Sequence, residues 1–219
     1  MLATPIAPNF GKNGEHKVAI PVLPMGEYGT ASAVDVTVNM CRSFPNIRIG
    51  LMVGIGRGAP SPTRDIRPGD VVVSVTPAGQ GGVFRYVFGK SIQEKSFQQT
   101  RILNQRPQAL LAVVATLESD HMIDGNGIED AIKETLQRNS RLEKDFSRPH
   151  ESKDILFQST FVHMPHSDSC HSCHSDTANV VRREDRTKDD TGTQVHYGTI
   201  TSANTLMKNA IGDMNALVM

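Results

Sequence analysis

Apolar and polar positions in the first quarter of the chain change period twice, and each period predicts a different element. His16–Leu23 alternates weakly and then becomes apolar, which indicates a strand. Thr30–Cys41 carries apolar residues at helical spacing, with Thr30 or Ser32 as the expected N-cap. The nearly continuous apolar run Ile47–Val53 is typical of a strand buried on both faces of a parallel sheet. The order strand, helix, strand predicts a βαβ unit with a right-handed crossover.

The same two periods recur downstream, and their alternation predicts an α/β fold class. Further strands are expected at Asp70–Val75, Val83–Phe88 and Val195–Thr201. Further helices are expected at Pro107–Leu117 and Gly127–Leu136, and another is expected to begin over Thr205–Ala210.

Two stretches break the pattern. Residues 1–15 are rich in Gly, Pro and Asn, and we expect a disordered lead-in to a domain that spans residues 16–219. Residues 137–192 are polar and too long for an ordinary loop, so we interpret them as a partly disordered insertion. Within this insertion the mixed-charge run Arg182–Asp190 predicts a solvated loop, because its charges nearly cancel.

Three glycines follow the apolar run Ile47–Val53 at alternate positions: Gly54, Gly56 and Gly58. Glycine lets the backbone turn sharply and approach a ligand closely, because it has no Cβ. Ligands of open α/β sheets bind beyond the carboxyl ends of the strands. The glycine run therefore predicts one edge of a ligand site, where backbone N–H groups could meet a ribose or an anion.

The composition excludes several classes of function. Lys and Arg number 23, as do Asp and Glu, so the chain has no basic character of the kind that nucleic-acid-binding proteins show. No apolar run approaches the roughly 20 residues of a membrane helix, and no membrane partner is expected. The N-terminal residues lack the basic region and apolar core of a signal peptide. Three cysteines, an odd number, argue against a disulfide framework and favour an intracellular, cytoplasmic setting.

Six segments, in order along about residues 16–212, resemble a known family. They are Leu23–Thr30, Met40–Pro45, Leu51–Gly58, Asp65–Ser74, Gly81–Lys90 and His196–Asn204. The family is the nucleoside phosphorylase and nucleosidase superfamily, in the form found as N-terminal phosphorylase-like domains of fungal NLR-type proteins. The resemblance implies a phosphorylase/hydrolase-like fold, in which a central mixed twisted sheet carries helices on both faces.

The resemblance also implies a reaction, the cleavage of the N-glycosidic bond of purine nucleosides or nucleotides. Its transition state resembles an oxocarbenium ion, so an enzyme must stabilise a cationic sugar and protonate the departing base. Phosphate attacks the sugar in phosphorylases, and water attacks it in nucleosidases. The implied partners are therefore a nucleoside or nucleotide and, in a phosphorylase, phosphate. A homo-oligomer is also expected, and no cofactor is.

The resemblance places the substrate-binding residues at matching positions. They are Gly26, Gly54, Ile55, Gly56, Ser202, Asn204 and Leu206. Ile55 stands where the family has a serine that contacts phosphate, and isoleucine cannot donate a hydrogen bond. Ala203 replaces the glycine of the family's Ser-Gly-Asp/Asn segment near the base. Leu206 stands where some members stack an aromatic ring on the purine. No catalytic residue is assigned.

Two segments of the family have no counterpart in this sequence. One is an opening Leu-Pro-x-Glu motif; the other is a Glu-Met-Glu segment and an Asp-bearing strand, which follow the helix after Asn204. We therefore expect a domain that is truncated at both ends, through an incomplete gene prediction or in the product itself, with impaired cleavage. The alternative is a non-catalytic purine-binding or signalling module of a fungal NLR-type protein. Sheet edges uncovered by truncation favour oligomerisation.

Cysteines and histidines cluster inside the insertion. Cys170 and Cys173 have the spacing of half a tetrahedral zinc site, and His171 and His174 lie beside them. The same residues match the C-x-x-C-H pattern of c-type haem attachment. The other half of a zinc site is not clearly spaced, and haem attachment needs an export route and a buried pocket. We therefore expect a solvated polar insertion without metal, and zinc is the alternative.

Overall fold

The structure is a computed structural model, and its described residues fall into two compact units. It describes residues 9–61, 63–75, 83–85, 89–90, 98–99, 107–162, 177–187 and 192–202. The first unit contains residues 9–56 and residue 202, and the second contains the other described residues between 57 and 201. Each unit is described by itself.

The first unit opens with an antiparallel hairpin. Strand β1 (Asn9–Asn13) pairs with strand β2 (His16–Ile20), and the register runs from Asn9 opposite Ile20 to Asn13 opposite His16. Gly14 supplies the left-handed conformation of the tight turn, with φ of 57°. Residues 9–15 are thus folded and not the disordered lead-in that their composition predicted. The composition did not predict the hairpin, because a hairpin needs only a short polar turn between two short strands of alternating residues.

Helix α1 (Thr30–Ser43) follows at the predicted place. The predicted N-cap is wrong, because Gly29 occupies that position and no side chain caps the helix. Gly29 has φ of 92°, a conformation that Thr and Ser rarely adopt, so the chain geometry at the entry to the helix selects glycine.

The apolar run Ile47–Val53 does not form the buried strand that its hydrophobicity predicted. It has no regular secondary structure, and Leu51, Met52 and Val53 are 77%, 92% and 91% exposed. The predicted βαβ unit therefore lacks its second strand. An apolar run makes burial favourable, but a strand also needs a neighbour that accepts its backbone hydrogen bonds. No strand of the described residues pairs with this run.

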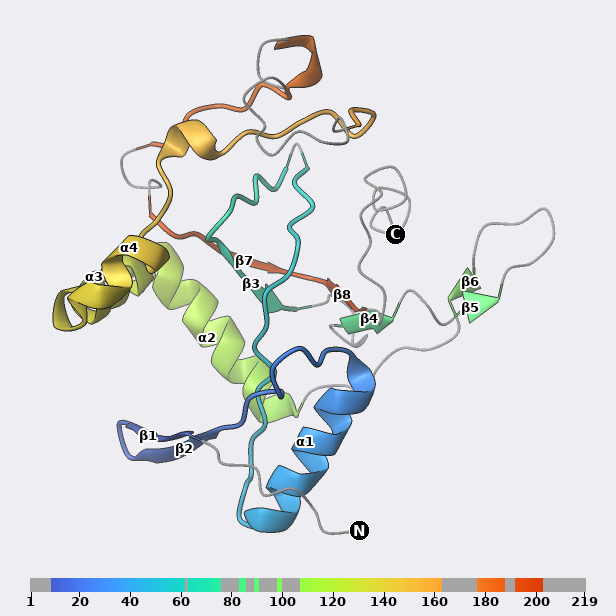
Figure 1. The fold of residues 1–219 in the computed structure, drawn as a ribbon, viewed down its shortest axis with the longest axis vertical. Coiled ribbons are helices and arrows are strands. Elements are labelled where there is room, and N and C mark those ends of the chain that lie inside the picture. Colours follow the sequence, from blue (N-terminus) through green and yellow to red (C-terminus); the bar gives the residue numbers. More distant parts are fainter. Residues whose placement is uncertain are drawn as a thin grey trace. The chain divides into compact units, whose positions relative to one another are not determined.

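The second unit contains a parallel pair of strands that are far apart in the sequence. Strand β3 (Val71–Ser74) lies beside strand β7 (Val195–Gly198), in register from Val71 opposite Val195 to Ser74 opposite Gly198 (Figure 1). Both strands confirm the predictions for Asp70–Val75 and for the start of Val195–Thr201. β3 has the Val-Val-Val sequence typical of strands in parallel sheets.

The remaining strands form two further small sheets. Strand β8 (Ile200–Ser202) is separated from β7 by the single residue Thr199 and pairs with strand β4 (Val83–Arg85). Strand β5 (Gly89–Lys90) pairs antiparallel with strand β6 (Gln98–Gln99). The described residues thus mix helices with small parallel and antiparallel sheets, as in an α/β protein. They form four two-stranded sheets, and the central twisted sheet is not among them.

Three helices of the second unit follow one another between residues 108 and 146. They are α2 (Gln108–Asp124), α3 (Ile128–Arg138) and α4 (Ser140–Phe146). The first two confirm the predicted helices, although α2 continues beyond the expected end at Leu117. It stops only at Gly125, whose φ of 78° breaks the helix. None of the helices in the described part of the chain has the length and apolar character that crossing a membrane requires.

The predicted insertion is partly folded. It contains α4 and two single-turn 3-10 helices, η2 (Glu151–Lys153) and η4 (Thr177–Asn179). Segments from its two halves pair through an antiparallel bridge between Phe157 and Val180. The bridge is extended by two N–H···O bonds of 2.8 Å, Gln158 to Asn179 and Val181 to Leu156. The apolar island that the sequence shows at Ile155–Val162 thus serves to join the two halves.

Candidate functional site

The carboxylate of Asp70 is the most densely bonded polar group among the described side chains. Its side chain is 0% exposed. Arg186 donates to both oxygens, from Nη1 to Oδ1 at 3.0 Å and from Nη2 to Oδ2 at 2.5 Å. The backbone N–H of Arg67 donates to Oδ2 at 2.8 Å, and that of Gln194 to Oδ1 at 3.1 Å. Nε2 of His196 lies 3.0 Å from Oδ2 and donates to it, since an ionised carboxylate can only accept.

A tight turn places Asp70 at this point. Gly69 has φ of 92°, and the backbone N–H of Asp70 donates to the carbonyl of Arg67 at 3.0 Å. The reciprocal bond from Arg67 N–H to the Asp70 side chain closes the turn, as short polar side chains commonly do. β3 begins at the next residue. The sequence Arg-Pro-Gly-Asp therefore makes a turn and aims a carboxylate at the start of the parallel strand pair.

The hydrogen bonds outweigh the cost of burying this charge. Burial alone raises the pKa of Asp70, but the bonds from Arg186, from the two backbone N–H groups and from His196 hold it well below its ordinary value. The same pairing with Asp70 raises the pKa of Arg186. Both groups therefore remain ionised across the physiological range.

Two further aspartates and two further arginines surround this pair. Asp65 contacts Arg67 at 2.5 Å and Arg183 at 3.2 Å. Asp154 contacts Arg183 at 2.8 Å and Arg67 at 3.8 Å. Arg67 also donates to the carbonyl of Glu184 at 2.6 Å. Although partial burial raises the pKa of Asp65, the hydrogen bonds and charges of the two arginines lower it overall.

The six side chains form an ion-pair cluster in which charges of both signs balance. We call the set Asp65, Arg67, Asp70, Asp154, Arg183 and Arg186 the Asp–Arg cluster. It joins the loop before β3 to both halves of the insertion. Because each guanidinium is already held by a carboxylate, the cluster's chemistry is that of a structural connection rather than of a free anion site.

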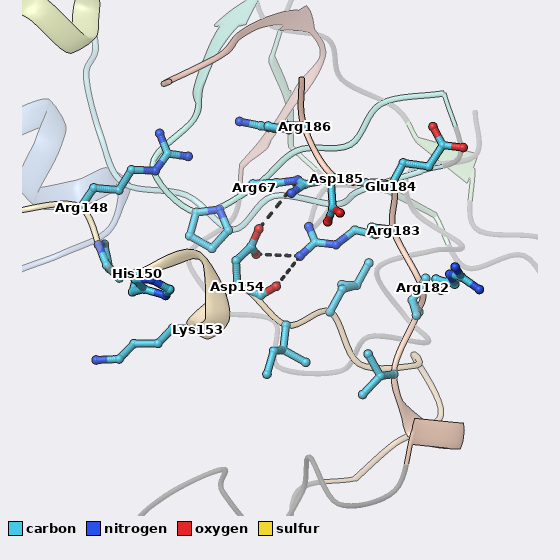
Figure 2. A pocket seen from close by; sticks show the side chains of 16 residues that line it. Arg67, Arg148, His150, Lys153, Asp154, Arg182, Arg183, Glu184, Asp185 and Arg186 are labelled. Carbon is cyan, nitrogen blue, oxygen red and sulfur yellow. Dashed lines mark hydrogen bonds and ion pairs between the residues drawn. The ribbon is translucent and has the colours of Figure 1, made fainter. Parts of the chain in front are cut away.

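A cavity of about 490 Å³ lies beside the Asp–Arg cluster (Figure 2). Its apolar lining comes from the bridged segments of the insertion, at Ile155, Leu156, Val180 and Val181. Arg148, Lys153 and Arg182 also line it, but Figure 2 shows their side chains at separate places around the ion pairs. The cationic groups therefore do not converge on one point, as they would in a phosphate site.

A second cavity, of about 650 Å³, lies beside β7. Its lining includes Arg64, Glu118, His121 and Tyr197, and the Tyr197 hydroxyl lies 2.9 Å from Nδ1 of His121. Burial raises the pKa of Tyr197, and the charge of Glu118 raises it further. The tyrosine therefore stays protonated and ties helix α2 to strand β7.

The structure describes only part of the predicted substrate site. Five of its residues belong to the first unit: Gly26, Gly54, Ile55, Gly56 and Ser202. Asn204 and Leu206 lie outside the described residues. The glycine loop is open to solvent, since Ile55 is fully exposed and a Cβ added at Gly54 or Gly56 would meet no atom within 4 Å. The part of these residues in ligand binding stays a prediction.

The predicted metal ligands cannot be placed. Cys170, His171, Cys173 and His174 all lie outside the described residues. Among the residues that the structure does describe, no group of three or more His, Cys, Asp or Glu side chains could hold a metal ion.

Sequence reasoning missed the Asp–Arg cluster and misread the mixed-charge run Arg182–Asp190. Arg183 and Arg186, which lie within it, are only 14% and 11% exposed, so this part of the run is not the solvated loop that was expected. The overlooked signal is the apolar pair Val180–Val181 directly before the run, which indicates a segment that packs against the fold. Balanced charges within a run do not exclude partners elsewhere in the chain.

Comparison with curated proteins finds similarity to a nucleotide-binding leucine-rich repeat (NLR)-like protein of the fungus Hyaloscypha variabilis. The two sequences are 34% identical over 202 residues, which cover 92% of this chain. The chain spans only 19% of the length of that relative. No model of a protein family matches the chain, and no solved structure does. The comparison thus supports a relation to fungal NLR-like proteins.

Proposed function

We propose that the chain is a purine nucleoside- or nucleotide-binding domain of the nucleoside phosphorylase type, within an NLR-type protein. The observation that carries the proposal is the parallel pairing of β3 with β7. Two of the segments that resemble the phosphorylase family, Asp65–Ser74 and His196–Asn204, supply these strands. Segments more than a hundred positions apart are therefore adjacent in one sheet, as a shared ligand site requires.

The polarity of the pair supports a ligand site beyond its carboxyl end. Both strands run in the same direction and end together, with Ser74 opposite Gly198. Ligands of α/β proteins bind beyond the carboxyl ends of such strands. Ser202 and Asn204 follow β7 in the sequence. Their hydroxyl and amide groups are the types of side chain that recognise ribose and a purine edge by hydrogen bonds.

The phosphate contact of a phosphorylase would differ in this chain. Ile55 offers no hydroxyl, so an anion at the glycine loop would depend on the backbone N–H groups of Gly54 and Gly56. A nucleoside, which has no phosphate, makes no such demand. We therefore propose purine and ribose recognition as the core of the function, with cleavage of the N-glycosidic bond as its enzymatic form.

Thermal unfolding in the presence of adenosine, adenine and ATP tests the binding proposal. A ligand that binds only the folded state at about 100 times its Kd stabilises that state by about 2.7 kcal/mol. The expected result is a rise in Tm with at least one of the three compounds. Ser202→Ala should reduce the rise, whereas Ser119→Ala should not, since the Ser119 hydroxyl bonds only the carbonyl of Ala115 on exposed α2. Identical melting curves with and without all three compounds would overturn the proposal.

Chromatography of the same mixtures separates binding from catalysis. Free adenine released from adenosine or ATP would assign the domain to the cleaving enzymes. A stable ligand complex without free adenine would assign it to the non-catalytic binding modules, which is the form that fits a signalling protein of NLR type.

A further inference from the structure

We propose that Arg186 is a positioning residue that sets the register between β3 and β7. It acts through Asp70 and links the insertion to the parallel strand pair. The consequence for ligand binding rests on the proposed function, because the carboxyl ends of these strands form the proposed site. The effect on register stands independently of any ligand.

Parallel strands need a register signal that antiparallel hairpins obtain from their turn. β3 and β7 are separated by a long connection, so no short loop fixes their alignment. Three consecutive valines in β3 also specify the alignment weakly, because Val71, Val72 and Val73 are alike. A set of directional polar contacts at the start of the strand pair could supply the register signal that the apolar side chains do not supply.

Asp70 and Arg186 make such contacts at the start of the strand pair. Asp70, one residue before β3, accepts bonds from Gln194 N–H and from the His196 side chain of β7. Arg186 holds both carboxylate oxygens and also donates to the carbonyl of Gly192, 3.3 Å away on the segment that leads into β7. A shift of one residue, about 3.3 Å along a strand, would move each of these partners beyond bonding distance.

The guanidinium group is required for this role. Nη1 contacts Asp70 and the carbonyl of Gly192, while Nη2 contacts Asp70 and the carbonyl of Asp65 at 3.1 Å. Lysine carries the same charge but presents it at a single nitrogen, so it cannot reach all four acceptors from one position. The Arg186→Lys change therefore removes the simultaneous hydrogen bonds to four acceptors and keeps the positive charge.

Disulfide trapping tests the register directly. In a chain with Cys41, Cys170 and Cys173 changed to Ser, the pair Val71→Cys and Val195→Cys occupies opposite positions in the observed register. The pair Val73→Cys and Val195→Cys would meet only after a slip of two residues. We expect the first pair to cross-link in the parent chain and the second to remain reduced.

Adding Arg186→Lys should change this outcome. We expect the second pair to cross-link and the yield of the first to fall, whereas the matched control Arg138→Lys should leave both unchanged, since Arg138 pairs with Glu134 on an exposed helix face. Unaltered cross-linking of both pairs in Arg186→Lys would overturn the proposal.

Amide exchange provides a second measurement without added cysteines. The N–H groups of Val71 and Val75 donate to the carbonyls of Gln194 and Gly198 at 2.9 and 2.8 Å, and so report on the strand pair. In Arg186→Lys their exchange should become roughly ten- to hundredfold faster, while that of α2 stays unchanged. An equal rise in α2 would indicate general destabilisation and contradict a register role. Should Arg186→Lys not fold, His196→Leu, which removes the contact of His196 Nε2 to Asp70, takes its place in both measurements.

The ligand experiment keeps the two proposals distinguishable. If the parent chain melts identically with every purine, the proposed function fails, yet the cross-linking result still decides the register. If the parent chain is stabilised by a purine, Arg186→Lys should lose most of that stabilisation, and Arg138→Lys should retain it.

Discussion

Arg186 and Asp70 form a two-point guanidinium–carboxylate pair between residues 116 positions apart in the sequence. The carboxylate is completely inaccessible to solvent, and the arginine is 11% exposed. Such a pair is not strong evidence for stability, because removing two charges from water costs about as much as their attraction returns. The loss of one partner has a much larger effect, because the other charge is then buried alone.

Asp70→Asn should therefore destabilise the protein strongly. The amide keeps the shape but removes the carboxylate that Arg186 binds at two points, and breaking a buried pair in this way costs about 3–5 kcal/mol. Urea unfolding monitored by circular dichroism gives the free energy. Asp130→Asn is the matched control, because Asp130 pairs with Lys133 at 3.8 Å on an exposed helix face, where a pair contributes about 0–1 kcal/mol. Equal losses in the two variants would show that the Asp70 pair is no more than a surface contact.

The free energy of unfolding should also depend on pH, because the bonded aspartates stabilise the protein only while they are ionised. The pKa values of Asp70 and Asp65 are lowered in the folded protein, so both groups contribute stability that is fully present above the ordinary aspartate pKa of about 3.9. That contribution is lost as the pH falls below about 4, because the unfolded chain then takes up protons that the folded chain does not.

Urea unfolding at pH 7, 5, 4 and 3 measures this loss. The parent chain should lose stability steeply between pH 4 and 3. Asp70→Asn, which has no carboxylate at that position, should show a flatter curve over the same interval. A parent curve as flat as that of the variant would mean that Asp70 titrates normally in the folded state.

The elements that sequence predicted correctly are those set by local pattern. The helical spacing of apolar residues identified α1, α2 and α3, and the β-branched run before Ser74 identified β3. These signals are local, because each depends on residues within a few turns of one another. The exact end of α2 escaped prediction because the helix continues through polar residues until Gly125 stops it.

The features that sequence did not predict depend on distant partners. Ile47–Val53 has the composition of a buried strand, yet no strand of the described residues pairs with it. Arg183 and Arg186 have the local pattern of surface charges, yet they bind aspartates more than a hundred positions away or on the other half of the insertion. The local sequence pattern indicates which secondary structure or exposure a segment prefers. Which residues the segment contacts is determined by the tertiary structure.

Asn126→Ala should weaken the junction between the helices and β7. The Asn126 side chain accepts from the backbone N–H of Ile128 at 3.0 Å and donates to the carbonyl of Thr193 at 2.7 Å, so it links the first residue of α3 to the segment before β7. Thr193 is buried, and leaving its carbonyl unpaired costs about 1–3 kcal/mol. Urea unfolding of Asn126→Ala and of the control Asn139→Ala gives the two free energies.

The control distinguishes the exposed contact of Asn139 from the part-buried contact of Asn126. The Asn139 side chain donates to the carbonyl of Thr135 at 3.0 Å on an exposed surface, where water can replace the lost bond. Its removal should change stability by about 0.5 kcal/mol or less. A loss for Asn139→Ala as large as that for Asn126→Ala would contradict a special role for the Thr193 contact.

Two glycines of the run after Val53 should respond differently to alanine. A Cβ at Gly58 would lie 2.8 Å from Cγ2 of Ile66, and a β-branched side chain moves aside poorly because its χ1 rotation is restricted. Gly58→Ala should therefore cost about 1–3 kcal/mol through overpacking. A Cβ at Gly56 would meet no atom within 4 Å, and Gly56 does not have a positive φ. Gly56→Ala should be neutral or stabilise the protein by up to about 1 kcal/mol, because alanine restricts the unfolded chain.

The cause of the Gly58 effect can be isolated by removing its neighbour. Ile66→Ala alone should destabilise the protein, because Ile66 is half-buried. Combined with Gly58→Ala, however, the second alanine should cost little more, since Cγ2 of Ile66 is gone and the remaining Cβ lies at 3.4 Å, an ordinary contact distance. Thermal unfolding of the four chains of this double-mutant cycle gives the coupling free energy. Strictly additive losses would place the penalty at Gly58 in the backbone and not in the contact with Ile66.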